Sequence, residues 1–423
     1  QMLIRLSLIL LVCTASQAEN RDKTYTVSTL DADRYTLKQD TRYILYDVNH
    51  GEGFNLRRDV YMRVANAVRI LREREGVNAV LVLPPWGGLY HWKDRLTGIP
   101  WSEFFDVSSL NRFVPVIEFE EYLTVFAGRT IDRVIYLQHF SEGWEGEYVM
   151  KSDRRPCIDG DRYYQSDQNT QLWRGWFYGF SDVRAKDFEC VSFQGDSDTF
   201  ADLLKRNYTD QSIFVDRAET VLHSDYGSRE YWRARRSMRY APHLEHIADR
   251  YISETLKEDL QGEELPEDWT EEQPSRSSSG GSYVCAHWRR RDFVRAHAAE
   301  LPSVAGAARQ ISDLAEQYNV QKVFLATDAP EEEIAELRSM IPFEMYTFRA
   351  EPDEPLIDGA AAIVEQIICA RARAFTGSHV STFSYRIQED REIRGFPVET
   401  TFRRMCPDGK DTCEQPAKWK IVH

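Results

Sequence analysis

The sequence predicts an α/β protein with two doubly wound, Rossmann-like domains that face each other across a central cleft. The chain has 423 residues, 42% of them apolar and 12% aromatic, which is enough to bury two cores. In both halves, apolar runs of strand length alternate with segments of helical periodicity. An acidic stretch that becomes rich in Pro, Ser and Gly, residues 258–281, separates the halves and predicts a linker or long loop. We therefore expect one domain over residues 19–257 and a second over residues 282–423.

The first half begins with a predicted β-α-β unit. Between its two strands, apolar residues recur at helical spacing from Leu56 to Leu71. The strands that we expect in this half are residues 42–48, 79–83, 133–138 and 212–216. Residues 141–200 are rich in Trp, Tyr and Gly, and we expect them to be irregular.

The second half shows the clearest alternation of strands and helices. The expected strands are residues 283–287, 322–326, 344–348 and a short strand at Phe375. The expected helices are residues 304–318, 331–340, 360–372 and one that begins near Ser381. Such an alternation predicts a parallel sheet that is covered by helices on both faces.

The first residues and the charge restrict the compartment and the partners. Residues 3–12 are mostly apolar and Ala15-Ser16-Gln17-Ala18 fits a cleavage site, so residues 1–18 predict a secretory signal peptide. We find no later apolar run that approaches the roughly 20 residues of a membrane span. A formal charge of -15 argues against a general nucleic-acid binder. The sequon at Asn207 predicts a glycosylated surface position in a luminal chain.

Six cysteines follow the predicted signal peptide, which fits an oxidising compartment. We expect two disulfides in polar, loop-like surroundings, Cys157–Cys190 and Cys406–Cys413. Cys285 and Cys369 lie inside apolar runs, and we expect both to be buried free thiols. Zinc binding by the last pair is disfavoured, because no second Cys or His pair lies near it.

Three loops at the expected carboxyl ends of strands carry unusual polar residues, and this is where parallel sheets bind ligands. In the loop of residues 51–58, Glu52 stands between two glycines just ahead of a helix, so its carboxylate is unobstructed and nearby amides can face an anion. Glu52 could equally complement the helix N-terminus. Residues 287–293 (HWRRRDF) bring three arginines to a strand end, which suits phosphate oxygens, although a solvated basic turn paired with acids would look the same. Residues 381–386 offer hydroxyls and amides that could hold an anion or simply cap a helix.

Three D-x-D sequences resemble the metal-binding motif of sugar-nucleotide transferases. They lie at residues 31–33, 159–161 and 196–198. Three copies are about what chance gives in an acidic chain, and none clearly ends a buried strand, so we interpret them as loop acids. The sequence has no P-loop, no G-x-S-x-G and no H-E-x-x-H motif, which disfavours ATPases, α/β-hydrolases and zincins.

From about Arg42 to the C-terminus the sequence resembles the GDP-fucose protein O-fucosyltransferases, and among them those that act on thrombospondin type 1 repeats. The segments that carry the resemblance are 51–61 (GEGFNLRRDVY), 81–87 (LVLPPWG), 90–92 (YHW), 99–105 (IPWSEFF), 174–177 (RGWF), 235–238 (RRSM), 287–293 (HWRRRDF), 381–384 (STFS) and 413–416 (CEQP). They occur in the same order as in the family.

The resemblance implies a luminal enzyme of GT-B fold, in the endoplasmic reticulum or the Golgi, that moves L-fucose from GDP-fucose to Ser or Thr of a folded repeat. Glu52 matches the family's general base and Arg289 the arginine that holds the β-phosphate. The positions that match GDP contacts are Gly53, Phe54, Asn55, His287, Ser381, Thr382 and Phe383. Glu365 matches an acid that contacts guanine, although Asp is more common there, and Cys285 departs from the family pattern as a core substitution.

The chemistry of these residues agrees with an inverting transfer, in which a base takes the acceptor proton and a cation meets the departing pyrophosphate. We expect no metal requirement, because Arg289 can neutralise that charge. The Trp- and Tyr-rich segments 86–105 and 173–180 could receive a small basic acceptor domain, or could be mainly core. Two alternatives stay open: a fucosyltransferase for EGF-like repeats, and a non-catalytic luminal chaperone of the same fold.

Overall fold

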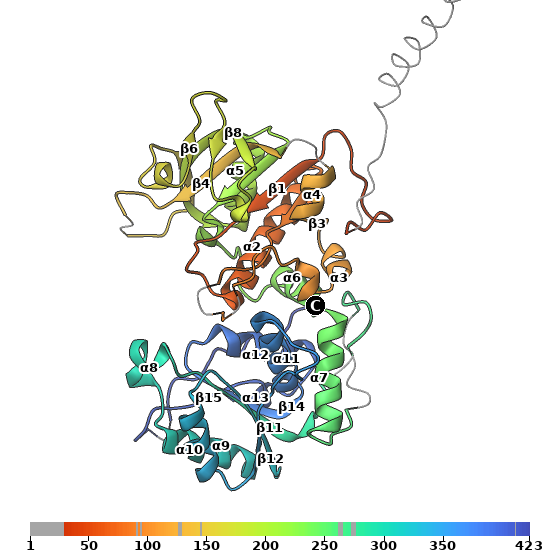
Figure 1. Ribbon diagram of the computed structural model, residues 1–423, viewed down its shortest axis with the longest axis vertical. Helices are drawn as coiled ribbons and strands as arrows, with labels where there is room; N and C mark the ends of the chain where they lie inside the picture. The colour runs from red at the N-terminus through yellow and green to blue at the C-terminus, as the bar shows by residue number, and fades with distance from the viewer. Residues whose placement is uncertain are drawn as a thin grey trace, which may run out of the picture.

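The computed structural model describes residues 29–423 except 90–91, 94, 126–128, 144–145, 261–264, 272–275 and 411. The predicted signal peptide and two residues of the YHW motif, Tyr90 and His91, lie outside the described residues. Two lobes, each built on its own sheet, are stacked along the long axis of the molecule (Figure 1). The upper lobe comes from the first half of the chain and the lower lobe mainly from the second.

The upper lobe is built on a sheet whose central strands are parallel, in the order β3-β2-β1-β9-β4-β8. These strands are β1 Arg42–Tyr46, β2 Ala79–Leu83, β3 Val116–Glu118, β4 Thr130–Gln138, β8 Arg184–Asp196 and β9 Ser212–Asp216. Short strands extend its β8 side: β5 Lys151–Arg154, β6 Gln165–Ser166, β7 Trp173–Arg174 and β10 Val221–Leu222. The helices are α2 Phe54–Glu73, α3 Val107–Asn111, α4 Phe119–Val125, α5 Ser197–Asn207 and α6 Arg229–Ser237. Apolar side chains from both faces of β1 enter two separate core clusters, so helices and loops cover both faces.

The prediction that residues 141–200 are irregular is wrong in its last part. Residues 184–196 form the long strand β8, which pairs with β4, and α5 begins at Ser197. Four charged residues in the first half of β8 hide its strand pattern, and two of them, Asp187 and Glu189, pair with Arg133 of β4. Asn207, at the end of α5, is exposed, as a glycosylated position must be.

The lower lobe has a parallel sheet in the order β13-β12-β11-β14-β15, as the alternation predicts. Its strands are β11 Gly281–Trp288, β12 Lys322–Thr327, β13 Glu344–Tyr346, β14 Ala372–Gly377 and β15 Arg403–Arg404. Its helices are α8 Phe293–Ala296, α9 Val304–Gln317, α10 Glu331–Met340, α11 Asp358–Ala370, α12 Thr382–Ile393 and α13 Val398–Thr401. Single 3₁₀ turns lie at Trp101–Glu103, Gly160–Arg162, Phe177–Gly179, Ala218–Thr220 and Ala298–Glu300.

The segment between the two predicted domains is more closely packed than a linker would be. Helix α7, Pro242–Glu254, falls in the range predicted for the first domain but packs against α11 of the lower lobe. Within the predicted linker, Trp269 is buried, and its indole N–H donates to the carbonyl of Ser109. The division into domains at residues 258–281 remains a prediction.

The cysteines form three disulfides among the described residues. Cys157–Cys190 and Cys406–Cys413 are the two predicted pairs. The prediction of two free core thiols is wrong, because Cys285 of β11 and Cys369 of α11 are bonded to each other, with Cα atoms 5.1 Å apart. Helix α11 packs directly on β11, so the two apolar runs bury their cysteines in the same layer. A linear sequence does not show which residues of two packed elements face each other.

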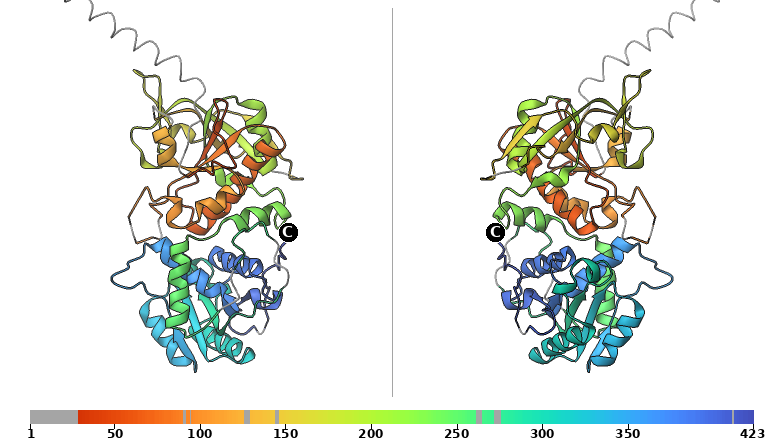
Figure 2. Two further views of the ribbon diagram at one scale, coloured as in Figure 1. Left: turned by 90° about the vertical axis from the view of Figure 1, so that its right-hand side faces the viewer. Right: turned by 90° about the vertical axis from the view of Figure 1, so that its left-hand side faces the viewer.

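A buried network of polar and charged side chains joins the lobes at the waist between them. Figure 2 shows the ribbon of this junction from two sides. Arg235 of α6 donates to Glu389 and Asp390 of α12, both at 2.6 Å. Arg58 of α2 donates to Gln366 of α11 at 2.7 Å. Since buried charges cost free energy unless they are paired, each lobe depends on the other to satisfy them. Among the described residues, no helix combines the length and apolar character needed to cross a membrane.

Candidate active site

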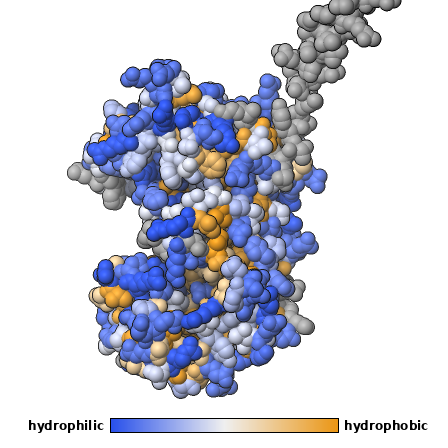
Figure 3. Space-filling view, in the orientation of Figure 1, coloured by the Kyte–Doolittle hydropathy of each residue, from blue (hydrophilic) through white to orange (hydrophobic). Residues whose placement is uncertain are grey.

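A cleft of about 870 Å³ opens between the two lobes. The upper lobe contributes the loop that follows β1, and the lower lobe contributes the loops that follow β11, β12 and β14. The N-terminal ends of α2, α11 and α12 reach the same space. Apolar side chains gather at the surface of this waist, between two hydrophilic lobes (Figure 3). The location is the one that parallel sheets favour for ligands, beyond the carboxyl ends of the strands.

Glu52 lies in the short loop between β1 and α2 and lines the cleft from the upper lobe. Its side chain is partly exposed, and among the described residues its carboxylate has no hydrogen-bond or ion-pair partner. Gly53 is the N-cap of α2, and no side chain caps that helix. Free amide groups at the start of a 20-residue helix therefore face the cleft beside a free carboxylate.

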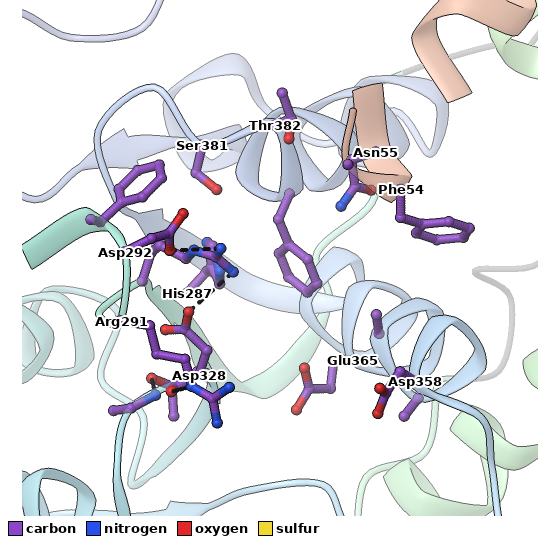
Figure 4. A pocket seen from close by; sticks show the side chains of 18 of the residues that line it. Phe54, Asn55, His287, Arg291, Asp292, Asp328, Asp358, Glu365, Ser381 and Thr382 are labelled. Atoms are coloured by element: carbon purple, nitrogen blue, oxygen red, sulfur yellow. Dashed lines mark hydrogen bonds and ion pairs between the residues drawn. The ribbon is translucent and has the colours of Figure 1, made fainter. Parts of the chain in front are cut away.

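Asn55 and Phe54, the next two residues, have different roles. The Phe54 ring is 2% exposed and packs on Trp86 with ring centroids 4.9 Å apart, so it belongs to the core and turns away from the cleft in Figure 4. Asn55 Oδ1 accepts hydrogen bonds from Arg58 and Gln366, both at 3.1 Å. Its Nδ2 group is left facing the cleft as a donor.

Arg289 follows β11 and lines the cleft from the lower lobe. Its guanidinium pairs with Asp292 at 2.8 Å and with Asp328 at 3.1 Å, and it remains 26% exposed toward the cleft. The neighbouring Arg290 turns away and pairs with Glu333 at 2.6 Å. Both arginines are therefore paired with acids, as the alternative of a basic turn predicts. Arg289 differs from Arg290 because it lines the cleft, where its partly exposed guanidinium can meet an anion.

His287 and Phe383 form one wall of the cleft. The rings stack with centroids 4.3 Å apart, and His287 Nδ1 lies 2.8 Å from the hydroxyl of Ser384. Burial, helped by the charge of Arg289, lowers the pKa of His287 to about 3. The imidazole is therefore neutral at physiological pH and can act as a hydrogen-bonding group but not as a cation.

Ser381 and Thr382 open helix α12 at the rim of the cleft (Figure 4). The Ser381 side chain makes no capping hydrogen bond, so the ordinary cap interpretation does not describe it. Val380, just before them, has a φ of 39°, an unfavourable conformation for a β-branched residue. This bend carries the chain from β14 into α12 and directs the helix N-terminus into the cleft.

Glu365 lies on α11 at the far end of the cleft from Ser381 (Figure 4). Burial raises the pKa of this carboxyl to about 8, and the charge of Asp328 contributes in the same direction. Without a ligand the carboxyl is therefore largely protonated at neutral pH.

Sequence reasoning missed Asp328 and Gln366, which orient Arg289 and Asn55. Asp328 directly follows strand β12, and a carboxylate at a strand end was a signal that could have found it. Gln366 is fully buried inside an apolar helix, and only the tertiary structure identifies its role.

The D-x-D sequences lie outside this cleft. The expectation that none ends a buried strand is wrong for Asp196, the last residue of β8, but its carboxylate accepts the Thr199 N–H at 2.8 Å and caps α5. Asp198 pairs with Arg74. Within the described part of the chain, no three His, Cys, Asp or Glu side chains are grouped to hold a metal ion.

Two Rossmann-like lobes, with helix N-termini, an arginine and a carboxylate lining the cleft between them, have the architecture of a GT-B nucleotide-sugar transferase. The chain belongs to the GDP-fucose protein O-fucosyltransferase family, whose sequence profile matches residues 43–394. It is 52% identical over 410 residues to GDP-fucose protein O-fucosyltransferase 2 of Caenorhabditis elegans, covering 96% of both chains. It is 46% identical over 391 residues to the human protein of the same name, covering 90% of both. The structure of POFUT1 in complex with GDP-fucose matches with a TM-score of 0.56 at 15% identity, covering 87% of this chain and 98% of that one, and shows the shared fold.

Proposed function

We propose that this protein transfers L-fucose from GDP-fucose, with inversion, to a Ser or Thr hydroxyl of a folded thrombospondin type 1 repeat. One observation carries the proposal: a free carboxylate, Glu52, and an oriented guanidinium, Arg289, line one cleft from opposite lobes. An acceptor that enters from the upper lobe meets the base, and a donor held by the lower lobe meets the cation.

The donor nucleotide fits the lower lobe by its chemistry. Glu365, once ionised, can accept hydrogen bonds from the N1–H and amino groups of guanine. The stacked rings of His287 and Phe383 offer a flat wall without charge. The amides at the start of α12, with the hydroxyls of Ser381 and Thr382, suit phosphate oxygens, and Arg289 suits the β-phosphate. Gly53 and Asn55 meet the sugar end from above.

The reaction then needs one displacement. Glu52 takes the proton of the acceptor hydroxyl, and the oxygen attacks C1 of fucose from the face opposite the departing phosphate. The bond between C1 and the phosphate oxygen breaks, GDP leaves with the electron pair, and the β-linked donor gives an α-linked product. Arg289 neutralises the charge that develops on the leaving group, so we propose that no metal ion is required.

The secretory pathway, and within it the lumen of the endoplasmic reticulum, is the proposed compartment. Three disulfides and an exposed sequon at Asn207 support an oxidising, glycosylating environment. The net charge of -15 suits a small basic acceptor domain.

The test is a transfer assay with GDP-fucose and three acceptors: a folded thrombospondin repeat, the same repeat reduced, and an EGF-like repeat. Intact-protein mass is read with and without EDTA. We expect a gain of one deoxyhexose on the folded thrombospondin repeat alone, unchanged by EDTA. Transfer to the EGF-like repeat instead would favour the other fucosyltransferase class. GDP-fucose binding without transfer to any acceptor would favour the chaperone.

A further inference from the structure

Arg57, in the first turn of α2, contacts the loop that carries Glu52 at three points. Its Nε donates to the main-chain carbonyl of Glu52 at 3.0 Å, and a terminal nitrogen donates to the carbonyl of Asn49 at 3.4 Å. The other terminal nitrogen pairs with the carboxylate of Asp47 at 3.6 Å. The side chains of Arg57 and Asp47 are 17% and 13% exposed, so these contacts lie mostly out of water.

The same loop is fixed a second time from β9 and the turn that follows it. The N–H of Asp47 donates to the carbonyl of Val215, and its carbonyl accepts the N–H of Ala218, both at 2.9 Å. The N–H of Asn49 donates to the carboxylate of Glu219 at 3.0 Å. The backbone is therefore held at positions 47, 49 and 52, while the carboxylate of Glu52 itself stays free.

We propose that Arg57 is a positioning residue for Glu52, held in place by Asp47 and assisted by Glu219. The proposal rests on the proposed function, because it assigns Arg57 a role only through the general base. Arg57 does not line the cleft, so it is not expected to touch the donor or the acceptor.

The geometry calls for arginine because three acceptors lie in different directions around one side chain. A guanidinium has five N–H donors in a fixed plane and can serve all three, whereas lysine is a single point charge on a flexible stem. Without Arg57, the carbonyl of Glu52 loses its hydrogen bond and the carboxylate of Asp47 loses its ion pair, although it still accepts the N–H of Val48. The loop between β1 and α2 is then free to shift. A displacement of about 1 Å at a reacting group can lower a rate about 100-fold.

The test measures kcat, KM for GDP-fucose and the Kd of GDP-fucose by calorimetry for Arg57→Ala and Arg57→Lys. The acceptor is a folded thrombospondin repeat. We expect kcat to fall about 100-fold in Arg57→Ala and less in Arg57→Lys, with the donor Kd within twofold of wild type. A purely structural role would weaken donor binding in step with kcat.

The matched control is Arg69→Ala, because Arg69 lies on the same helix and is also ion-paired, with Glu73 and Glu230, about 18 Å further along. We expect it to keep the wild-type kcat. A kcat within threefold of wild type in Arg57→Ala would overturn the proposal. If Arg57→Ala does not fold, Arg57→Gln, which removes the charge but keeps most of the side chain, takes its place, and a kcat within threefold of wild type in that variant overturns the proposal. Failure of the proposed function is distinguishable, because the wild-type protein would then transfer no fucose.

Discussion

The affinity for GDP-fucose is expected to rise with pH, because the guanine contact needs an ionised Glu365. Burial and the charge of Asp328 raise the pKa of this carboxyl to about 8, whereas the N–H donors of guanine bind the carboxylate. The fraction of protein molecules that can bind GDP-fucose therefore grows as Glu365 loses its proton. For a pKa of about 8, the apparent Kd should fall about 25-fold between pH 6.5 and pH 8.5.

Calorimetric titration of GDP-fucose across this range measures the effect, and buffers of different ionisation enthalpy report the proton released on binding. In Glu365→Gln the pH dependence should disappear, because the amide does not titrate. The same ionisation bears on the stability of the ligand-free protein. The folded state binds more protons than the unfolded state between pH 4.5 and about 8, so the free energy of unfolding should fall as pH rises through that window and level off above it. A flat Kd in the wild type, or a pH dependence that persists in Glu365→Gln, would refute the reasoning.

Three further perturbations test the site and its support. Arg289→Ala should lower kcat/KM for GDP-fucose by about 100-fold or more, because the leaving pyrophosphate loses its cation. Steady-state kinetics at saturating acceptor measure this loss, and a wild-type kcat/KM would remove Arg289 from the mechanism. Replacing Cys285 and Cys369 together by Ala should lower the free energy of unfolding by about 4.5 kcal/mol in urea titrations, because the bond closes a loop across a sequence separation of 84. Free thiols at both positions in the wild type would contradict the pairing. Gly359→Ala should lower the free energy of unfolding by about 1–3 kcal/mol in the same assay, because a Cβ at this position would lie 2.7 Å from the Trp92 side chain of the other lobe. Unchanged stability would argue against that contact.

The sequence predicted the lower lobe well because its elements obey the two simple periodicities. Helix α9 shows a clean apolar stripe, and β12 is a short buried run between polar residues. Strand β8 was not predicted because charged residues interrupt its apolar pattern, and two of them are accommodated by ion pairs with Arg133 of the neighbouring strand. The local pattern of apolar and polar residues does not show which distant residues form such ion pairs.

The sequence could predict which polar and charged residues follow the strands, but not how their side chains are arranged in the site. Glu52 and Arg289 follow β1 and β11, and the sheet topology brings them to one cleft. Phe54 was predicted to contact GDP, yet its ring packs in the core against Trp86, which the local sequence does not show. The pairing of Cys285 with Cys369 depends on how α11 lies on β11, which is a tertiary fact.

The most direct test of the central claim is Glu52→Gln, which keeps the size of the side chain and removes its basicity. Fucose transfer to a folded thrombospondin repeat and the Kd of GDP-fucose are measured on the same preparation. We predict that kcat falls by about 100- to 10,000-fold while the Kd stays within twofold of wild type, because the residue acts on the acceptor proton and not on the donor. A transfer rate within a few-fold of wild type would contradict the assignment of Glu52 as the general base.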